Sequence, residues 1–287
     1  MNKIFISVRP LNILMIFFSQ FATVYFLGFK NELNNVFDFL HVSIYLSTIF
    51  SAAGAYILND LTDIKSDTVN KTYKKNIIEK RTKNIFFIAY LFFTFFALAI
   101  SFIASLKLGI VVFILIILLM FYNIFLKKLP LVGNILISLI TAFSIFIFNL
   151  FDSNIKVDLV LIFSIYAFGI NFIREIIKDA EDIEGDNIAG RFTFPILAGI
   201  KATRILLLIL IFVYVLIITI YVRIMVEKYF SYPLSSVFII YNVLCIGIPL
   251  FHLSVKAQYA WEKSDFVYMS KIAKYVMFTG ILSMLFF

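Results

Sequence analysis

The sequence predicts an all-α integral membrane protein with nine transmembrane helices. Three observations lead to this fold class. Of the 287 residues, 62% are hydrophobic and the mean hydropathy is +1.01, whereas soluble domains contain about 45–50% apolar residues. The apolar residues form nine long runs, and the basic residues gather on alternate connections between those runs.

A transmembrane helix needs about 20 mostly apolar residues, and each of the nine runs approaches or reaches that length. In chain order, the runs are residues 11–29, 39–58, 84–104, 108–126, 131–150, 158–174, 204–222, 233–252 and 269–287.

The first run follows Lys3 and Arg9, as the apolar part of a signal peptide would. No small-residue cleavage pattern follows it, and the run is long enough to span, so we expect a retained helix. The fourth and fifth runs are joined only by the basic turn LKKLPLVGN. With five prolines and ten glycines in all, no Pro-rich or Gly-rich linker divides the chain. We therefore expect one membrane domain over residues 1–287.

The formal charge of +8 would suit a nucleic-acid partner, but its distribution argues against one. With nine spans, 20 of the 25 Lys and Arg residues fall on the side of the N-terminus. These lie at Lys3 and Arg9 and within residues 59–83, 127–128, 174–204 and 256–274. Such a bias marks the cytoplasmic side of a membrane protein. We expect a multi-pass protein of the cytoplasmic membrane, in contact with lipids and not nucleic acid, with its N-terminus in the cytoplasm.

Two acidic clusters follow the second and sixth runs, on this cytoplasmic side. They read NDLTDIKSD at residues 59–67 and KDAEDIEGD at residues 178–186. Their aspartates share the offsets zero, three and seven: Asp60, Asp63 and Asp67, then Asp179, Asp182 and Asp186. On a continuous helix these offsets span about 60° of arc, so each cluster is expected to present one acidic face.

Carboxylates at the membrane are costly and are usually functional. Converging carboxylates repel one another unless cations lie between them, and Mg²⁺ prefers oxygen ligands and shares them with substrate phosphates. Asn59 and Glu181 could add further oxygens. The alternative is a solvated acidic loop that caps a helix, which matched spacing at two equivalent depths makes less favourable.

Basic residues lie where a polyanionic substrate would need them, although many also suit the role of membrane anchors. They are Arg9, Lys71, Lys74, Lys75, Lys127, Lys128, Arg174 and Lys178. A substrate with a polyanionic head and an apolar tail fits this setting, and a prenyl diphosphate is such a molecule. Mg²⁺ and basic side chains would stabilise the departing diphosphate, and aromatic faces would stabilise the allylic cation.

The two clusters resemble the paired aspartate motifs of the UbiA-type intramembrane prenyltransferases. NDLTDIKSD resembles the NDxxDxxxD signature of that family, and REIIKDAEDIEGD at residues 174–186 resembles its second motif. Arg9-Pro10 with Asn12, SAAGAYILND at residues 51–60, and YNIFLKKLPLVGN at residues 122–134 are similar to further family segments in the same order.

This resemblance implies nine helices around a central cavity and Mg²⁺-dependent transfer of a prenyl group from its diphosphate donor to a lipophilic acceptor. By match, the metal would be held by Asn59, Asp60, Asp63, Asp67, Asp179, Asp182 and Asp186, of which Asp60, Asp63, Asp179 and Asp182 would be catalytic. Substrate contacts would come from Arg9, Asn12, Asn59, Lys71, Tyr122, Lys127 and Arg174.

The chain departs from the family where many members have arginines and prolines after the first motif. Here the sequence reads NKTYKKN, so Lys71 and Lys74 or Lys75 replace arginines, and a lysine keeps the charge without the bidentate phosphate geometry. The second motif is closest in form to that of digeranylgeranylglyceryl phosphate synthases. The acceptor is therefore expected to resemble geranylgeranylglyceryl phosphate or a quinone precursor.

Two other functions remain open at this point. A UbiA-like membrane terpene cyclase would use the same metal site and quench the cation internally, without an acceptor. A transporter or scaffold could bind cations at the acidic clusters, but transport favours carboxylates in mid-helix on several spans. The clusters here follow apolar runs at the cytoplasmic end, beside basic residues, which favours a diphosphate site.

Overall fold

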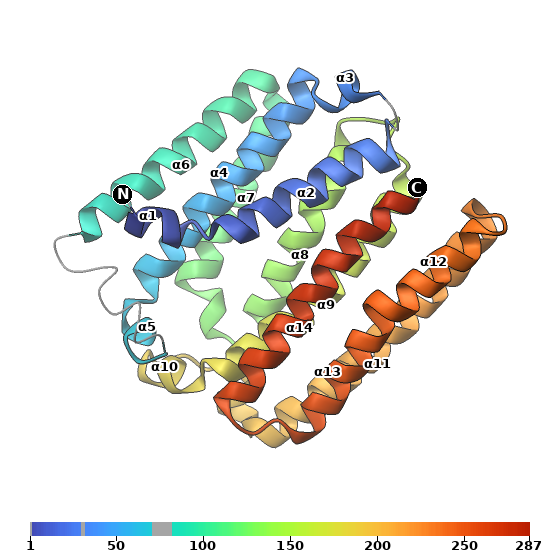
Figure 1. Cartoon of the computed structure of the whole chain (residues 1–287). Coiled ribbons are helices and arrows are strands. Elements are labelled where there is room, and N and C mark those ends of the chain that lie inside the picture. Colours follow the sequence, from blue (N-terminus) through green and yellow to red (C-terminus); the bar gives the residue numbers. More distant parts are fainter. Residues whose placement is uncertain (1, 30–31, 71–81) are drawn as a thin grey trace.

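The computed structural model describes residues 2–29, 32–70 and 82–287, and the regular secondary structure of these residues is entirely helical (Figure 1). The predicted substrate ligand Lys71, with Lys74 and Lys75, lies outside the described residues. The α-helices are α1 (Asn2–Ser7), α2 (Pro10–Leu27), α3 (Leu33–Val36), α4 (Phe39–Thr62), α5 (Ile64–Asn70), α6 (Lys83–Ala104), α7 (Leu106–Ile124), α8 (Val132–Phe146), α9 (Val157–Glu181), α10 (Ile183–Ile188), α11 (Phe194–Tyr229), α12 (Leu234–Asn242), α13 (Ile248–Tyr259) and α14 (Lys263–Leu282).

Nine helical segments of the described chain are long and apolar enough to cross a membrane, which confirms the predicted fold class. Short helical pieces complete some of them, such as Leu126–Lys128 after α7 and Val243–Gly247 between α12 and α13. Several spans extend beyond the predicted apolar runs. The last begins at Lys263, where the carboxylate of Asp265 accepts a hydrogen bond from the Glu262 backbone N–H at 3.1 Å. Such caps set helix ends regardless of hydropathy.

Helix α9 occupies the centre of the arrangement and is the most buried of the spans in the described chain. It packs against α8, α11 and α14, while α4 packs against α6 and α7. The approach of α14 is close because a Cβ atom on Gly280 would lie 2.0 Å from Cε1 of Tyr166 on α9. Small residues allow membrane helices to pack this tightly. The second acidic cluster is therefore fixed to the most enclosed helix of the fold.

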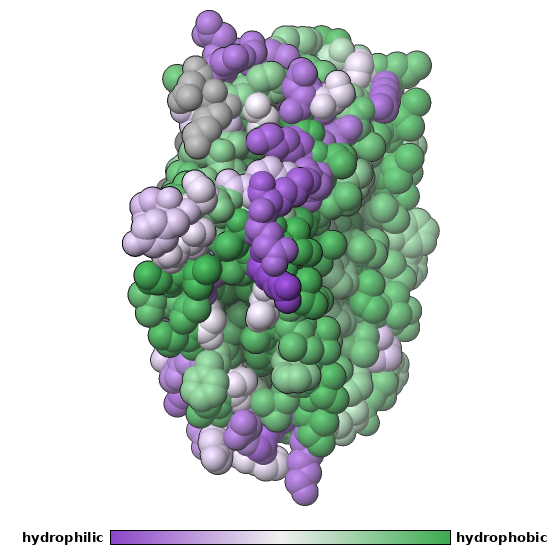
Figure 2. Space-filling model, turned by 90° about the vertical axis from the view of Figure 1, so that its right-hand side faces the viewer, coloured by the Kyte–Doolittle hydropathy of each residue, from purple (hydrophilic) through white to green (hydrophobic). Residues whose placement is uncertain are grey.

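Much of the surface is hydrophobic. Large apolar side chains such as Phe95, Ile103 and Phe212 are more than 60% exposed. Figure 2 shows one side of the molecule, where a broad hydrophobic surface is interrupted by hydrophilic patches. An apolar exterior of this extent suits a lipid environment, where it carries no penalty of hydration.

Candidate active site

Each acidic cluster straddles a break between a long helix and a short one. Helix α4 ends at Thr62 and α5 begins at Ile64, and the residue between them, Asp63, has φ −99° and ψ 8°. Helix α9 ends at Glu181 and α10 begins at Ile183, and Asp182 between them has φ −103° and ψ 11°. The expectation of one acidic face on a continuous helix is therefore wrong at both clusters.

The two breaks have matching backbone hydrogen bonds. The N–H of Asp63 donates to the carbonyl of Asn59 at 2.9 Å, and the N–H of Asp182 donates to that of Lys178 at 3.0 Å. The chain turns at the middle aspartate of each cluster, and the short helices α5 and α10 pack against each other. Local geometry thus directs the last part of each cluster toward the other.

Arg191 connects the two clusters, and sequence reasoning missed it. Its guanidinium forms an ion pair with Asp186 at 2.8 Å and a second ion pair with Asp63. The amine of Lys127 also pairs with Asp63 and donates to the hydroxyl of Thr62 at 2.6 Å. Residues from three separate parts of the chain therefore meet at Asp63.

The loop after α10 explains how Arg191 reaches this place. Gly190 has a left-handed φ of 69°, and the N–H of Arg191 donates to the carbonyl of Asp186 at 3.0 Å. The N–H of Gly190 donates to the carbonyl of Asn187 at 3.0 Å. Together these bonds form a Schellman motif, which turns the chain back along the end of a helix. The glycine–arginine pair after the second cluster was the sequence signal that could have revealed this residue.

The charges around this ion-pair network act on the carboxylates in different directions. Burial alone would raise the pKa of Asp63, but Lys127 and Arg191 outweigh it, so the pKa lies below the ordinary value. At Asp186, burial outweighs the effect of Arg191 and the pKa is raised. Asp63 therefore holds its charge more firmly than Asp186 does.

The first cluster is also connected to the N-terminal segment. Asp60 is buried, and its carboxylate accepts a hydrogen bond from the hydroxyl of Ser7 at 2.6 Å. Arg9 lies 3.5 Å from the same carboxylate and donates to the side-chain oxygen of Asn59 at 3.0 Å. Its guanidinium also lies 4.8 Å from the ring centre of Tyr56. Arg9 has a left-handed φ of 55° directly before Pro10, which aims its side chain at the end of α4.

The remaining motif aspartates lie around this network. Asp179 accepts a hydrogen bond from the side chain of Asn134 at 2.8 Å. Asp67 lies in the first turn of α5. Asp182 forms the break described above, between α9 and α10. The structure thus brings Asp63 and Asp186 onto a common partner and places the other four motif aspartates on the same helix ends.

The donor set around Arg191 fits Mg²⁺. Among the described residues, no three His, Cys, Asp or Glu side chains converge closely enough to hold a metal ion. Asp63 and Asp186 nevertheless face each other across one cation, the guanidinium of Arg191. Carboxylate oxygens that gather around a cation in this way are the ligands that Mg²⁺ prefers.

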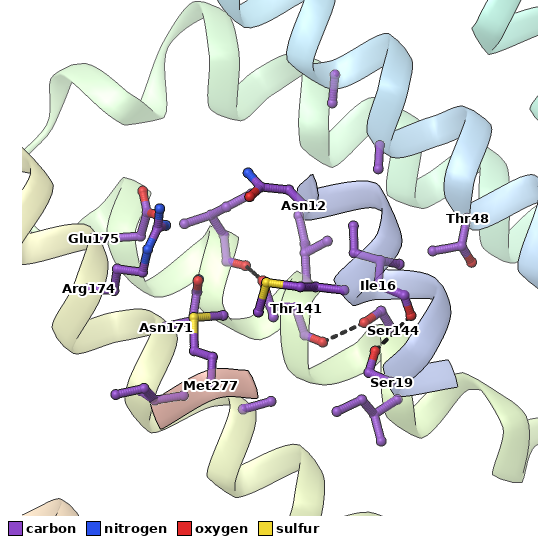
Figure 3. A pocket seen from close by; sticks show the side chains of 18 of the residues that line it. Asn12, Ile16, Ser19, Thr48, Thr141, Ser144, Asn171, Arg174, Glu175 and Met277 are labelled. Carbon is purple, nitrogen blue, oxygen red and sulfur yellow. Dashed lines mark hydrogen bonds and ion pairs between the residues drawn. The ribbon is translucent and has the colours of Figure 1, made fainter. Parts of the chain in front are cut away.

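A cavity of about 240 Å³ lies beside the acidic clusters, within the helices. Five predicted substrate ligands line it: Arg9, Asn12, Asn59, Tyr122 and Arg174. Figure 3 shows Asn12 on α2 on one side of the cavity and the pair Arg174 and Glu175 on α9 on another. The deeper lining is mainly apolar, with the hydroxyls of Ser19, Thr48 and Ser144 among the exceptions. The cavity therefore has a charged part and a largely apolar part, as an amphiphile requires.

Not every predicted site residue borders this cavity. Lys127 and the six motif aspartates are not among its lining residues, because ion pairs and hydrogen bonds turn several of them toward one another. Three further charged residues line it: Lys178, one of the basic residues expected to suit a polyanionic substrate, and Glu175 and Lys274, which were not predicted. Glu175 accepts hydrogen bonds from Arg174 at 3.2 Å and from Lys178 at 3.4 Å.

Comparison with known proteins gives a consistent result. The model of the UbiA prenyltransferase family matches residues 14–274. A digeranylgeranylglyceryl phosphate synthase of Sulfolobus acidocaldarius is 36% identical over 159 residues, which cover 54% of this chain and 56% of that protein. The synthase of Methanothermobacter thermautotrophicus is 32% identical over 173 residues, which cover 59% and 60%. The matched part thus spans little more than half the length of these relatives.

Solved structures share the fold. A structure described as that of digeranylgeranylglyceryl phosphate synthase in membranes has a TM-score of 0.68 and 21% identity, and the match covers 99% of each chain. A UbiA homologue from Archaeoglobus fulgidus, solved with DMAPP and Mg²⁺, has a TM-score of 0.63 and 17% identity over 99% of each chain.

Proposed function

Because this chain belongs to the UbiA prenyltransferase family, we propose that it transfers a prenyl group from its diphosphate to a lipophilic acceptor. The observation that carries the proposal is the pairing of two acidic clusters beside one amphiphilic cavity. A geranylgeranyl donor and an acceptor like geranylgeranylglyceryl phosphate are favoured, because similar proteins are digeranylgeranylglyceryl phosphate synthases. The whole chain acts as one membrane domain in this proposal.

The predicted site residues would contact the diphosphate or hold the metal, depending on where they lie. Arg9, Arg174 and Tyr122 would contact the diphosphate from the cavity, with Asn12 nearby, and Lys127 would contact it from beside Asp63. Mg²⁺, when bound, would neutralise the diphosphate and help it to depart. Its ligands would be Asn59, Asp60, Asp63, Asp67, Asp179, Asp182 and Asp186. The bond between the prenyl carbon and the diphosphate oxygen would break first and release diphosphate. The acceptor hydroxyl oxygen would then bond to the allylic carbon, and its proton would pass to the released diphosphate.

The apolar part of the cavity would hold the prenyl chain and exclude water from the cation. Below Asn59 on α4, the lining residues Ala55, Ala52, Ser51 and Thr48 are small. They leave space at helical spacing along one face. A chain that starts near Asn59 would run down this face, away from the acidic clusters.

This arrangement predicts that Ser51→Leu shortens the preferred donor. Ser51 lies eight positions before Asn59, roughly 12 Å along the helix, so a leucine there would obstruct a twenty-carbon chain and leave room for a five-carbon one. We expect geranylgeranyl transfer to fall by about tenfold or more, with dimethylallyl transfer little changed. Steady-state rates with both donors measure this. Ser51→Ala is the control and should keep both rates. An equal loss with both donors would contradict the placement of the chain.

Membranes that contain the protein test the proposed reaction directly. They are incubated with labelled geranylgeranyl diphosphate, Mg²⁺ and geranylgeranylglyceryl phosphate, and the products are weighed by mass spectrometry. An adduct of the two prenyl compounds that is absent with Asp63→Ala supports the proposal. A hydrocarbon or terpene alcohol as the sole product would instead identify a terpene cyclase. If wild-type membranes form no more product than Asp63→Ala membranes, the proposed reaction is wrong.

The proposal places the N-terminus and the acidic clusters in the cytoplasm. It rests on the bias of basic residues, 20 of 25 on that side, and on the rule that such a bias marks the cytoplasmic side. A cysteine introduced at exposed Lys65 would then be labelled by an impermeant reagent only when the cytoplasmic face is accessible. Labelling from outside intact cells would reverse the orientation.

A further inference from the structure

Lys274 lies in the middle of a membrane span and faces the cavity. The charge count placed it with the cytoplasmic connections, but α14 begins at Lys263 and continues through it. Lys274 lies eleven positions further along, roughly 16 Å at the rise of an α-helix. It lines the cavity, whereas its neighbour Lys271 on the same helix is exposed and does not. A charged residue at such a depth usually serves a function.

Three of the four basic residues that line the cavity have a carboxylate partner. Arg9 lies 3.5 Å from Asp60, and Arg174 and Lys178 both pair with Glu175, at 3.2 Å and 3.4 Å. Within the described chain, Lys274 forms no ion pair, and its amine donates to the neutral side-chain oxygen of Asn12 at 2.9 Å. Among the described residues that line the cavity, Lys274 is thus the cation whose charge no neighbouring carboxylate neutralises.

An apolar stripe continues from Lys274 along the same face of α14. Met277 and Ile281 line the cavity beyond it, and so does Met284 in the 3-10 helix Ser283–Phe286 that continues α14. The spacing of Lys274, Met277 and Ile281 keeps them on one side of the helix. This stripe is separate from the small residues below Asn59 on α4. Both helices pack against α2, but α14 otherwise packs against α9 and α13 and α4 against α6 and α7, and Figure 1 shows α4 and α14 apart. The cavity therefore offers two apolar tracks, each with a polar end.

We propose that Lys274 and Asn12 form the subsite for the phosphate of the acceptor lipid, with its chain along Met277 and Ile281. This proposal deepens the proposed function and rests on it. The proposed function gives the donor diphosphate to Arg9, Arg174 and Lys127, each of which pairs with a carboxylate. The phosphate of the acceptor is a second anion. Lys274, which has no carboxylate partner among the described residues, lies on the other track and is the cation that remains to bind it. Lys274 acts as a specificity residue that selects a phosphate-bearing acceptor over a neutral one.

The test compares two acceptors that differ only in the phosphate, geranylgeranylglyceryl phosphate and geranylgeranylglycerol. Equilibrium binding of each to the purified protein is measured without donor. Lys274→Met is expected to weaken binding of the phosphate lipid by about tenfold to a hundredfold and to leave binding of the neutral lipid unchanged. Lys274→Arg should restore most of the loss, because the charge returns. The exposed Lys271→Met is the control and should match the wild type.

A second variant neutralises the charge of Lys274 without changing that residue. Asn12→Asp places a carboxylate where an amide now accepts from Lys274 at 2.9 Å. It should neutralise the amine without removing it, and weaken binding of the phosphate lipid as Lys274→Met does. Both variants are also assayed for turnover, where KM for the phosphate acceptor should rise more than kcat falls.

Several results would overturn the subsite. In Lys274→Met, an equal loss of binding for both lipids would do so, and so would unchanged binding of the phosphate lipid. A rise in KM for the donor alone, or a wild type that binds neither lipid, would also overturn it. The binding readout needs no chemistry, so the two proposals can fail separately. Phosphate-lipid binding that depends on Lys274 without any transfer would reject the reaction and keep the subsite. Prenyl transfer that does not depend on Lys274 would support the reaction and reject the subsite.

Discussion

Asp63→Asn is expected to reduce prenyl transfer by about a hundredfold to a thousandfold. Asp63 is the middle residue of the first cluster, and it pairs with both Lys127 and Arg191. The two basic residues hold the pKa of Asp63 below its ordinary value, so this carboxylate is charged when a metal and a diphosphate arrive. The amide keeps the shape of the side chain and removes the charge that, in our proposal, binds the metal; it also removes the charge that pairs with Lys127 and Arg191. Initial rates at saturating donor and Mg²⁺ measure the effect.

Asp158→Asn is the matched control for this prediction. Asp158 also pairs with a lysine, Lys228, but its carboxylate lies at the start of α9, at the opposite end from Asp182. The control should keep activity close to that of the wild type. If Asp63→Asn also kept activity within a few-fold, with equal amounts of folded protein in the membrane, the assignment of the first cluster to catalysis would be wrong.

Arg191→Gln is expected to lower the midpoint of thermal unfolding by about 5 °C or more in the absence of divalent cations. Its guanidinium pairs with Asp63 and Asp186, and without it these two carboxylates face each other with less compensating charge. A divalent cation would relieve that repulsion. Mg²⁺ should therefore raise the unfolding midpoint of Arg191→Gln more than that of the wild type, where Arg191 competes for the same oxygens.

Unfolding of the purified protein in detergent, with and without Mg²⁺, measures this difference. Arg223→Gln provides the control, because Arg223 pairs only with Glu227 among the described residues, at 2.9 Å, and its side chain is 80% exposed. It should change neither the midpoint nor the response to Mg²⁺. An Arg191→Gln protein with an ordinary midpoint and the wild-type response would show that the guanidinium does not hold the two clusters together.

Long-range hydropathy predicted the fold well because a membrane span needs a long apolar run, and each of the nine runs has its counterpart in the described helices. Span ends were less predictable. Helix α14 begins at Lys263 because its first turn is capped by Asp265, and a helix can carry charged residues into the membrane where they face a cavity. Lys274 was counted with the cytoplasmic connection at residues 256–274 although the predicted run 269–287 contained it.

The site was predicted in part. Repeated aspartate spacing identified both clusters, but spacing alone could not show that the helices break at Asp63 and Asp182. Arg191 was missed because a turn through Gly190 brings it back beside Asp186. Asn134 was missed because its contact with Asp179 at 2.8 Å joins neighbouring helices. Such contacts depend on packing between elements, which a local pattern does not report.

The matching breaks at Asp63 and Asp182 have a consequence for the chain as a whole. One cluster belongs to the first part of the chain and the other to the second, and the ion pair between Asp63 and Arg191 spans 128 positions. A chain cut within residues 151–156, before α9, would leave one cluster on each fragment. Neither fragment could gather the carboxylates of both, so activity from co-expressed fragments would report their reassembly. Restored prenyl transfer would thus measure whether the two sets of helices associate in the membrane.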